Sequence, residues 1–268
     1  MKPVFIMKVY LSLISLAACL SVSCSGNLGD CSGSPRILPC KPKTPEETAR
    51  RAMKNHDFDA AVEALVPETE ALVADESLSE AERYRLHPLL SAAYSGRSGF
   101  GILTAVQSSS SGTGGGLIDQ MSGFVPSPQG MDPAAYSLRT EDMRLATVTL
   151  QSIPATLLSA LADDSYGKSA ALQLTLYQAA YSIMLMNQFI LSPTTGSFDP
   201  SRLDSMTDAD AEAILNALTG AGQVPGAQSP ELKTKIDSAL ATIDASPGES
   251  RRDKLADYLA KNGGGASP

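Results

Sequence analysis

The sequence predicts an all-α protein. Apolar residues recur at the three- and four-residue spacing of helices through most of residues 45–262, and the alternation typical of strands is nearly absent. Residues that favour a helix start precede several of these segments. One example is Thr44-Pro45-Glu46-Glu47, which precedes the first segment. Residues 169–198 carry no charge, which predicts a central apolar helix over about 170–191. We therefore expect helical hairpins stacked in an array, or an irregular bundle, around that helix.

Two helical hairpins are predicted at the start of this region, over residues 45–108. Ser79 and Glu82 have the spacing of a capping box, in which each residue satisfies a backbone N–H near the helix start. The predicted helices are residues 45–55, residues 57–75, a third from Ser79 that Gly96 to Gly101 breaks, and a short fourth with Ile102, Leu103 and Val106.

A Ser/Gly-rich insert follows at residues 108–131. Long segments of this kind between helices are either functional or disordered, and we expect a mobile loop. Its apolar part, residues 117–125, is the best candidate for contact with a partner. The candidate contact residues are Leu117, Ile118, Met121 and Phe124.

Helical periodicity resumes near Asp132 and Pro133 and continues to the end of the domain. Ile153-Pro154 is expected to bend or end a helix, because proline lacks the N–H that a helix interior needs. The later predicted helices are one opened by Thr140-Glu141-Asp142, a short one to about Ala162, one from Thr207-Asp208 to Leu218 ended by Gly220 and Gly222, and others at about 230–243 and 249–261. Residues 263–268 are expected to be a disordered tail.

The apolar residues between 172 and 191 surround the whole predicted helix. Such a helix is either a buried core helix or a membrane span, or it lines an apolar channel. Four neutral polar residues in it would be costly in hydrocarbon, which favours the core. These residues are Gln173, Gln178, Asn187 and Gln188.

Charge and composition exclude some classes of partner. The formal net charge is −8, and it becomes −10 when Lys2 and Lys8 are removed with the N-terminal segment. An acidic chain without a Lys/Arg cluster repels phosphate backbones, so we expect no nucleic-acid partner.

No motif for catalysis, for a cofactor or for a metal is found. The carboxylates between residues 204 and 212 lack the central glycine of a calcium-binding loop, so we interpret them as complements to a helix dipole. They are Asp204, Asp208, Asp210 and Glu212. The two histidines, His56 and His87, are interpreted as structural or solvated. We therefore expect neither an enzyme nor a bound cofactor.

Residues 1–18 predict a signal peptide. Lys2 and Lys8 precede an apolar run of about ten residues, which suits a signal peptide and is shorter than the ~18 residues of a membrane-spanning helix. The run ends in Leu-Ala-Ala before Cys19, which resembles the lipobox of bacterial lipoproteins. The resemblance implies that Cys19 carries lipid and becomes the mature N-terminus. Cys24 is the alternative, and an ordinary secretory signal is a third reading.

The four cysteines all lie in the first forty residues. Residues 19–44 are rich in Cys, Gly, Ser and Pro, which predicts a flexible tether. Because the periplasm is oxidising, we expect a disulfide between Cys31 and Cys40. Neither Leu20 after Cys19 nor Ser25 after Cys24 is the aspartate associated with inner-membrane retention, which favours the outer membrane.

The hairpins resemble tetratricopeptide repeats, which are helix–turn–helix units of about 34 residues. The matching positions of the first unit are Ala49, Ala52, Phe58, Ala61 and Leu65, and those of the second are Ala92, Ser95 and Gly99. The chain departs from the pattern at His56, where the motif prefers glycine, and at the missing closing proline. The resemblance covers about residues 45–108.

This combination also resembles, in layout, the helical T-component lipoproteins of TRAP-type uptake systems. The resemblance implies a lipid-anchored envelope protein that binds another envelope protein as an interaction scaffold, as an accessory to an envelope transport or assembly system. The alternative is a periplasmic carrier of a hydrophobic small molecule, with a cavity lined by residues 172–191. The partner and the oligomeric state do not follow from the sequence.

Overall fold

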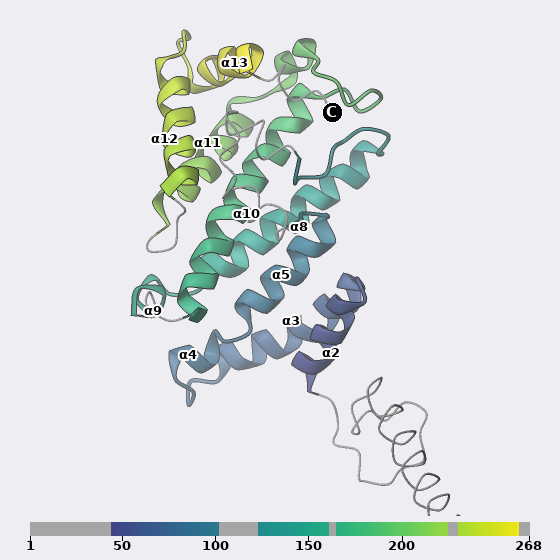
Figure 1. Ribbon diagram of the computed structural model, residues 1–268, viewed down its shortest axis with the longest axis vertical. Coiled ribbons are helices and arrows are strands. Elements are labelled where there is room, and N and C mark those ends of the chain that lie inside the picture. The colour runs from purple at the N-terminus through teal and green to yellow at the C-terminus, as the bar shows by residue number, and fades with distance from the viewer. Residues whose placement is uncertain (1–43, 102–122, 161–164, 225–229, 263–268) are drawn as a thin grey trace, which may run out of the picture. The chain divides into compact units, whose positions relative to one another are not determined.

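The computed structural model describes residues 44–101, 123–160, 165–224 and 230–262. These residues form ten α-helices and one 3-10 helix, η1, and no strand beyond an isolated β-bridge between Leu191 and Phe198, which confirms the all-α prediction (Figure 1). The elements are α2 (Pro45–Lys54), α3 (Phe58–Ala74), α4 (Glu80–Arg83), α5 (His87–Ser98), α8 (Pro133–Gln151), α9 (Ala155–Ala160), α10 (Ser165–Ile190), η1 (Pro200–Ser205), α11 (Asp208–Gln223), α12 (Pro230–Ala245) and α13 (Arg251–Asn262).

Several predictions concern residues outside the described ones. These are the signal peptide over 1–18, the short helix after Gly101 and the tail at 263–268. The tether over 19–44, which contains the four cysteines, also lies outside them except for Thr44. By its contacts the chain divides after Thr44, and the helices from Pro45 onward belong to one compact unit.

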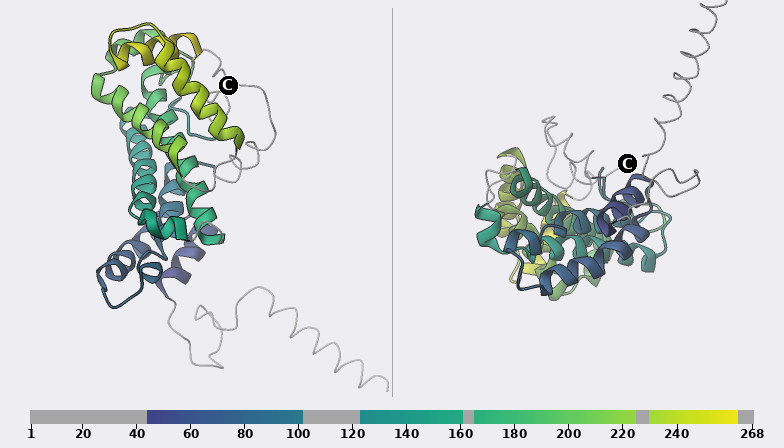
Figure 2. Two further views of the ribbon diagram at one scale, coloured as in Figure 1. Left: turned by 90° about the vertical axis from the view of Figure 1, so that its left-hand side faces the viewer. Right: turned by 90° about the horizontal axis from the view of Figure 1, so that it is seen from below.

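Each long helix packs against the next along the chain. The successive contacts join α2 to α3, α3 to α5, α5 to α8, α8 to α10, α10 to α11, α11 to α12 and α12 to α13 (Figure 1 and Figure 2). Helix α10 also contacts α5, α9 and η1, so it is central to the packing. Its fully buried large side chains are Tyr177, Leu176, Ile183, Met184, Met186 and Ile190.

The central helix is not buried on every side. Leu172, Leu185 and Phe189 are only partly buried against the main core. The residues next to them in the sequence are enclosed, among them Ala171, Met184, Met186 and Ile190. The prediction of a buried core helix therefore holds for most of its circumference. Among the described helices, none combines the length and hydropathy that a membrane span requires.

The helices of the first hairpin, α2 and α3, lie within one residue of their predicted bounds, 45–55 and 57–75. Ala49 and Ala52 are buried, and they belong with Ala61 and Leu65 to a second, smaller core cluster formed by α2, α3 and α5. The turn between the helices puts His56 at a φ of 59°, in the left-handed region that glycine occupies without strain. His56, which stands where the repeat motif prefers glycine, therefore adopts a backbone conformation that glycine would adopt more easily.

The predicted third helix is two helices. The capping box of Ser79 and Glu82 is present, but α4 ends at Arg83 and α5 begins at His87. Pro88 lies in the first turn of α5, where its missing N–H breaks no helical hydrogen bond, so it suits a new helix start rather than a helix interior. Gly99, with a φ of 87°, ends α5, and Gly96 lies inside that helix.

Two further boundaries differ from the prediction. Helix α8 begins at Pro133 with Asp132 as its cap, and Thr140 lies in its interior, where its hydroxyl donates to the Tyr136 carbonyl. Helix α11 continues through Gly220 to Gln223. A Cβ on Gly220 would lie 2.6 Å from Nε2 of Gln178, so the glycine makes room for a side chain of α10 instead of ending α11.

An ion pair joins α5 to α8. Arg97 donates to one carboxylate oxygen of Asp142 from Nη2 at 2.6 Å and from Nε at 3.0 Å. The Asp142 side chain is 14% exposed. The neighbouring pair of Arg144 and Glu141, at 2.7 Å, lies within α8 and is more exposed.

We expect D142N to lower the free energy of unfolding by about 1–2 kcal/mol at neutral pH, between the values typical of exposed and buried pairs. The matched control is E141Q, which removes a charge from an exposed pair one residue away and should cost at most about 0.5 kcal/mol. Urea unfolding of the two variants measures both. Equal losses would show that the interhelical pair has no special role.

Candidate functional site

A pocket lies at the C-terminal end of α10. The segment before α8 and the loop after α10 meet there, because the Gly130 N–H donates to the Pro193 carbonyl at 2.9 Å. The loop turns back at Gly196, whose φ of 70° suits glycine and whose absent Cβ would lie 2.8 Å from Gln129. The Asp199 N–H then donates to the Ile190 carbonyl at 2.7 Å, which places η1 beside the end of α10.

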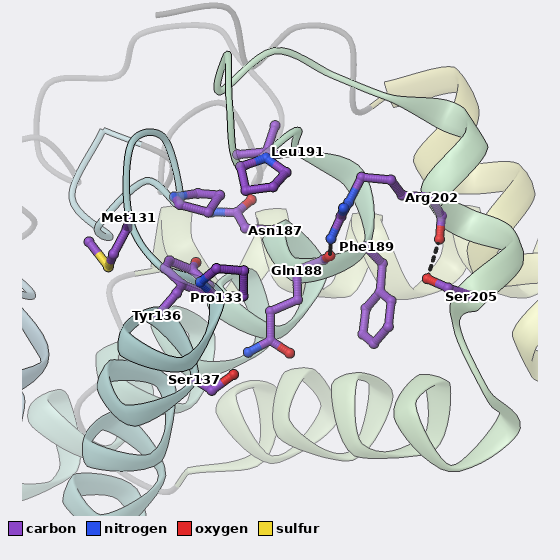
Figure 3. Close-up of a pocket in the computed structure, with 12 residues that line it drawn as sticks. Met131, Pro133, Tyr136, Ser137, Asn187, Gln188, Phe189, Leu191, Arg202 and Ser205 are labelled. Carbon is purple, nitrogen blue, oxygen red and sulfur yellow. Dashed lines mark hydrogen bonds between the residues drawn. The ribbon is translucent and has the colours of Figure 1, made fainter.

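The pocket has a volume of about 260 Å³ and a mixed polar and apolar lining (Figure 3). Its lining residues are Pro128, Met131, Pro133, Tyr136, Ser137, Asn187, Gln188, Phe189, Leu191, Pro193, Arg202 and Ser205. It meets the predicted carrier segment, residues 172–191, only at residues 187–191. Amides, hydroxyls and a guanidinium stand among the apolar side chains, unlike the apolar lining expected for a carrier of hydrophobic molecules.

Two buried neutral groups, Tyr136 and Asn187, form one side of the pocket. The Tyr136 hydroxyl donates to the Met184 carbonyl at 3.3 Å. The Asn187 side chain also acts on the pKa of this hydroxyl. Burial raises the pKa of the Tyr136 phenol strongly, and the hydrogen bond from Asn187 lowers it by less. The phenol therefore stays neutral. Asn187 Oδ1 is buried and has no hydrogen-bond partner among the described residues.

A cationic group, Arg202, forms another side. Its Nη2 donates to the Gln188 backbone carbonyl at 2.7 Å, and Figure 3 shows its guanidinium reaching from η1 to the end of α10. The Gln188 side chain donates to the Thr140 hydroxyl at 3.2 Å, which holds α10 against α8. Within the described part of the chain, no carboxylate lies within 4.0 Å of Arg202, and its Nε is buried without a hydrogen-bond partner.

Little in the sequence indicated this pocket. In the sequence, Asn187 and Gln188 stand out only as polar residues that disfavour a membrane span. Arg202 is the first basic residue after Lys168, and this position is the available signal in the sequence. Tyr136 and Ser137 come from a different helix and follow no recognisable motif.

The predicted partner-contact residues of the insert are not among the described residues that line this pocket. Leu117, Ile118 and Met121 lie outside the described residues, whereas Phe124 is partly buried against the main core and the following Val125 is buried. Their contact with a partner stays a prediction. The last residues of the insert, 123–131, are described. The Phe124 carbonyl accepts from the Gly101 N–H, and the Gly130 N–H donates to the Pro193 carbonyl.

The carboxylates near α11 serve the helix start. Thr207 and Asp210 form a capping box, and Asp208 lies in the same first turn. Among the described residues, no group of three or more His, Cys, Asp or Glu side chains is placed to hold a metal ion.

One face of α8 exposes apolar side chains. Leu138 is 68% exposed and Val148 is 43% exposed, and they are the exposed large hydrophobic residues of the described chain. Leu145, seven residues after Leu138, is partly exposed on the same face. Glu141 and Arg144 stand between them and pair with each other, so this α8 stripe has no unpaired charge.

Comparison with known proteins finds no family model, no curated protein and no solved structure that matches this chain. The fold and the site thus define an all-α protein of successively packed helices with a small pocket of mixed polarity at the end of its central helix.

The buried histidine, His87, predicts a pH dependence of stability. Its ring lies 4.8 Å from that of Tyr84, centroid to centroid, and its Nδ1 is buried without a partner among the described residues. Burial lowers the pKa of His87 below its ordinary value of 6.5, although a hydrogen bond with the Tyr84 backbone partly offsets this. Near pH 6.5, His87 therefore binds a proton more readily in the unfolded chain than in the folded one.

We expect the free energy of unfolding to decrease as the pH falls below 6.5, and this decrease to stop below the lowered pKa of folded His87. H87Q should be less stable at neutral pH because it loses the ring contact, but its stability should change less between pH 7.5 and 5.5. The control is H56Q, at the exposed histidine, which should keep the wild-type slope. Chemical unfolding at several pH values measures the change of the unfolding free energy with pH. If this change is the same in H87Q as in wild type, His87 is not its cause.

Proposed function

We propose that the protein is a lipid-anchored protein of the bacterial cell envelope that acts as an interaction scaffold for another envelope protein. The proposal combines two parts. The N-terminal sequence predicts a lipid attached to Cys19, with Cys24 as the alternative, and an outer-membrane location facing the periplasm. The helical domain supplies the binding surface.

The observation that supports a scaffold function is the succession of helix contacts from α2 to α13. Arrays in which each helix pair contacts its neighbours leave extended faces for partners. The α8 stripe lies on a helix in the middle of this succession. Because its only charges are paired, the partner should offer an apolar surface rather than a charged one.

The α8 stripe provides the test of the scaffold. In a crosslinked pull-down from solubilised envelope, wild type should recover one partner reproducibly, and L138S/V148S should recover it at least tenfold less. An interface that covers these side chains gains about 1.5–3 kcal/mol from each. Recovery should persist at high salt, because the contact is apolar.

The matched control is A241S/D244S, which changes two exposed positions of α12 and should recover the partner as wild type does. Substitutions at exposed sites rarely change stability by more than about 0.5 kcal/mol, so both variants should fold. Equal recovery by both variants would contradict the α8 stripe as the binding face. A separate variant with serine at Leu117, Ile118 and Met121 tests the face predicted in the insert.

The lipid anchor has its own test. In cells fed an alkyne analogue of palmitate, the wild-type chain should be labelled and C19S should lose the label, since the thiol of the lipidated cysteine accepts the acyl chains. C24S, C31S and C40S should keep it. Label lost only from C24S would move the anchor to that residue, and an unlabelled wild-type chain would contradict lipid anchoring.

A further inference from the structure

The pocket at the end of α10 holds a hydrogen-bond acceptor without a donor. Asn187 is 2% exposed, and its Oδ1 has no partner among the described residues. A buried polar atom left unpaired costs about 1–3 kcal/mol. The interaction of the Asn187 side chain with the Tyr136 hydroxyl leaves this oxygen unpaired. The group is suited to accept a hydrogen bond from a molecule with an N–H or O–H.

The same pocket holds a cation. The Arg202 guanidinium has five N–H donors, of which the Gln188 carbonyl takes one at 2.7 Å. Its Nε is unpaired, and no carboxylate of the described chain lies within 4.0 Å. A planar guanidinium matches the two oxygens of a carboxylate.

The volume and the walls limit what fits. A cavity of about 150 Å³ holds benzene, so 260 Å³ suits a molecule of on the order of ten non-hydrogen atoms. The side chains of Phe189 and Leu191 and three prolines supply apolar contact. A nucleotide or a long acyl chain is too large.

We propose that this pocket binds a small carboxylic acid that carries an amino or hydroxyl group and a short apolar chain. Its carboxylate pairs with Arg202, its N–H or O–H donates to Asn187, and its apolar chain lies against Phe189 and Leu191. This binding is independent of the proposed scaffold function, because the α8 stripe contributes none of these four residues.

Isothermal titration of the purified full-length protein tests the chemical class. The probes are L-leucine, its hydroxy-acid counterpart 2-hydroxy-4-methylpentanoate, 4-methylpentanoate without the donor, and isopentylamine without the carboxylate. L-leucine or the hydroxy acid should bind, and each truncated probe should bind at least tenfold more weakly. Binding of neither complete probe, or equal binding of a truncated one, overturns the proposal.

Matched variants then test the residues. R202Q and N187L should weaken binding of the probe at least tenfold. R252Q should not, although Arg252 also donates to a backbone carbonyl, that of Met206 at 2.6 Å. Q178L is the control for N187L, because Gln178 is another buried amide of α10 with an unpaired oxygen and does not line the pocket.

Circular dichroism and thermal unfolding of all four variants separate lost binding from lost folding. If R202Q and N187L remain folded and bind the probe as wild type does, the assignment of the pocket is wrong. If the controls R252Q and Q178L weaken binding as much as the pocket variants, the effect is structural and the proposal also fails.

Discussion

The burial of α10 is the constraint on which the rest of the structure depends. A helix of 26 residues that is enclosed over most of its circumference cannot carry ionised side chains along its buried length, because removing a charge from water costs several kcal/mol. Its buried polar residues are accordingly neutral, as at Gln178 and Asn187. The neighbouring helices adapt to them. Gly220 of α11 leaves space for Gln178, and the Ser182 hydroxyl donates to the Ile214 carbonyl of α11 at 3.2 Å.

Local chemistry made the helices predictable, and tertiary contact decided where several of them end. The helical spacing of apolar residues and the caps at Ser79 and Thr207 are properties of a few neighbouring residues. Gly220 is different, since a glycine that ends a helix and one that makes room for a side chain look alike in sequence. Thr140 similarly resembles a cap, yet its hydroxyl bonds within α8.

The pocket could not be predicted, because its chemistry is assembled from α8, α10 and η1. Arg202 and Tyr136 are 66 positions apart, and only the loop between α10 and η1, folded back through Gly196, brings their helices together. No spacing rule covers such a set. In contrast, the α8 stripe is periodic, but periodicity does not distinguish an exposed face from a buried one. Only the packing of α8 on α5 and α10 shows which side remains open.

The separation of the core into two clusters has a mechanical consequence. The smaller cluster, formed by α2, α3 and α5, directly follows the segment that ends at Thr44. Any tension applied through that segment enters the domain at α2, which contacts α3 and few other elements. Cooperative units with few buried contacts open first. The α2–α3 hairpin would then act as an extensible link that unravels under load while α8 and α10, with their pocket and stripe, remain folded.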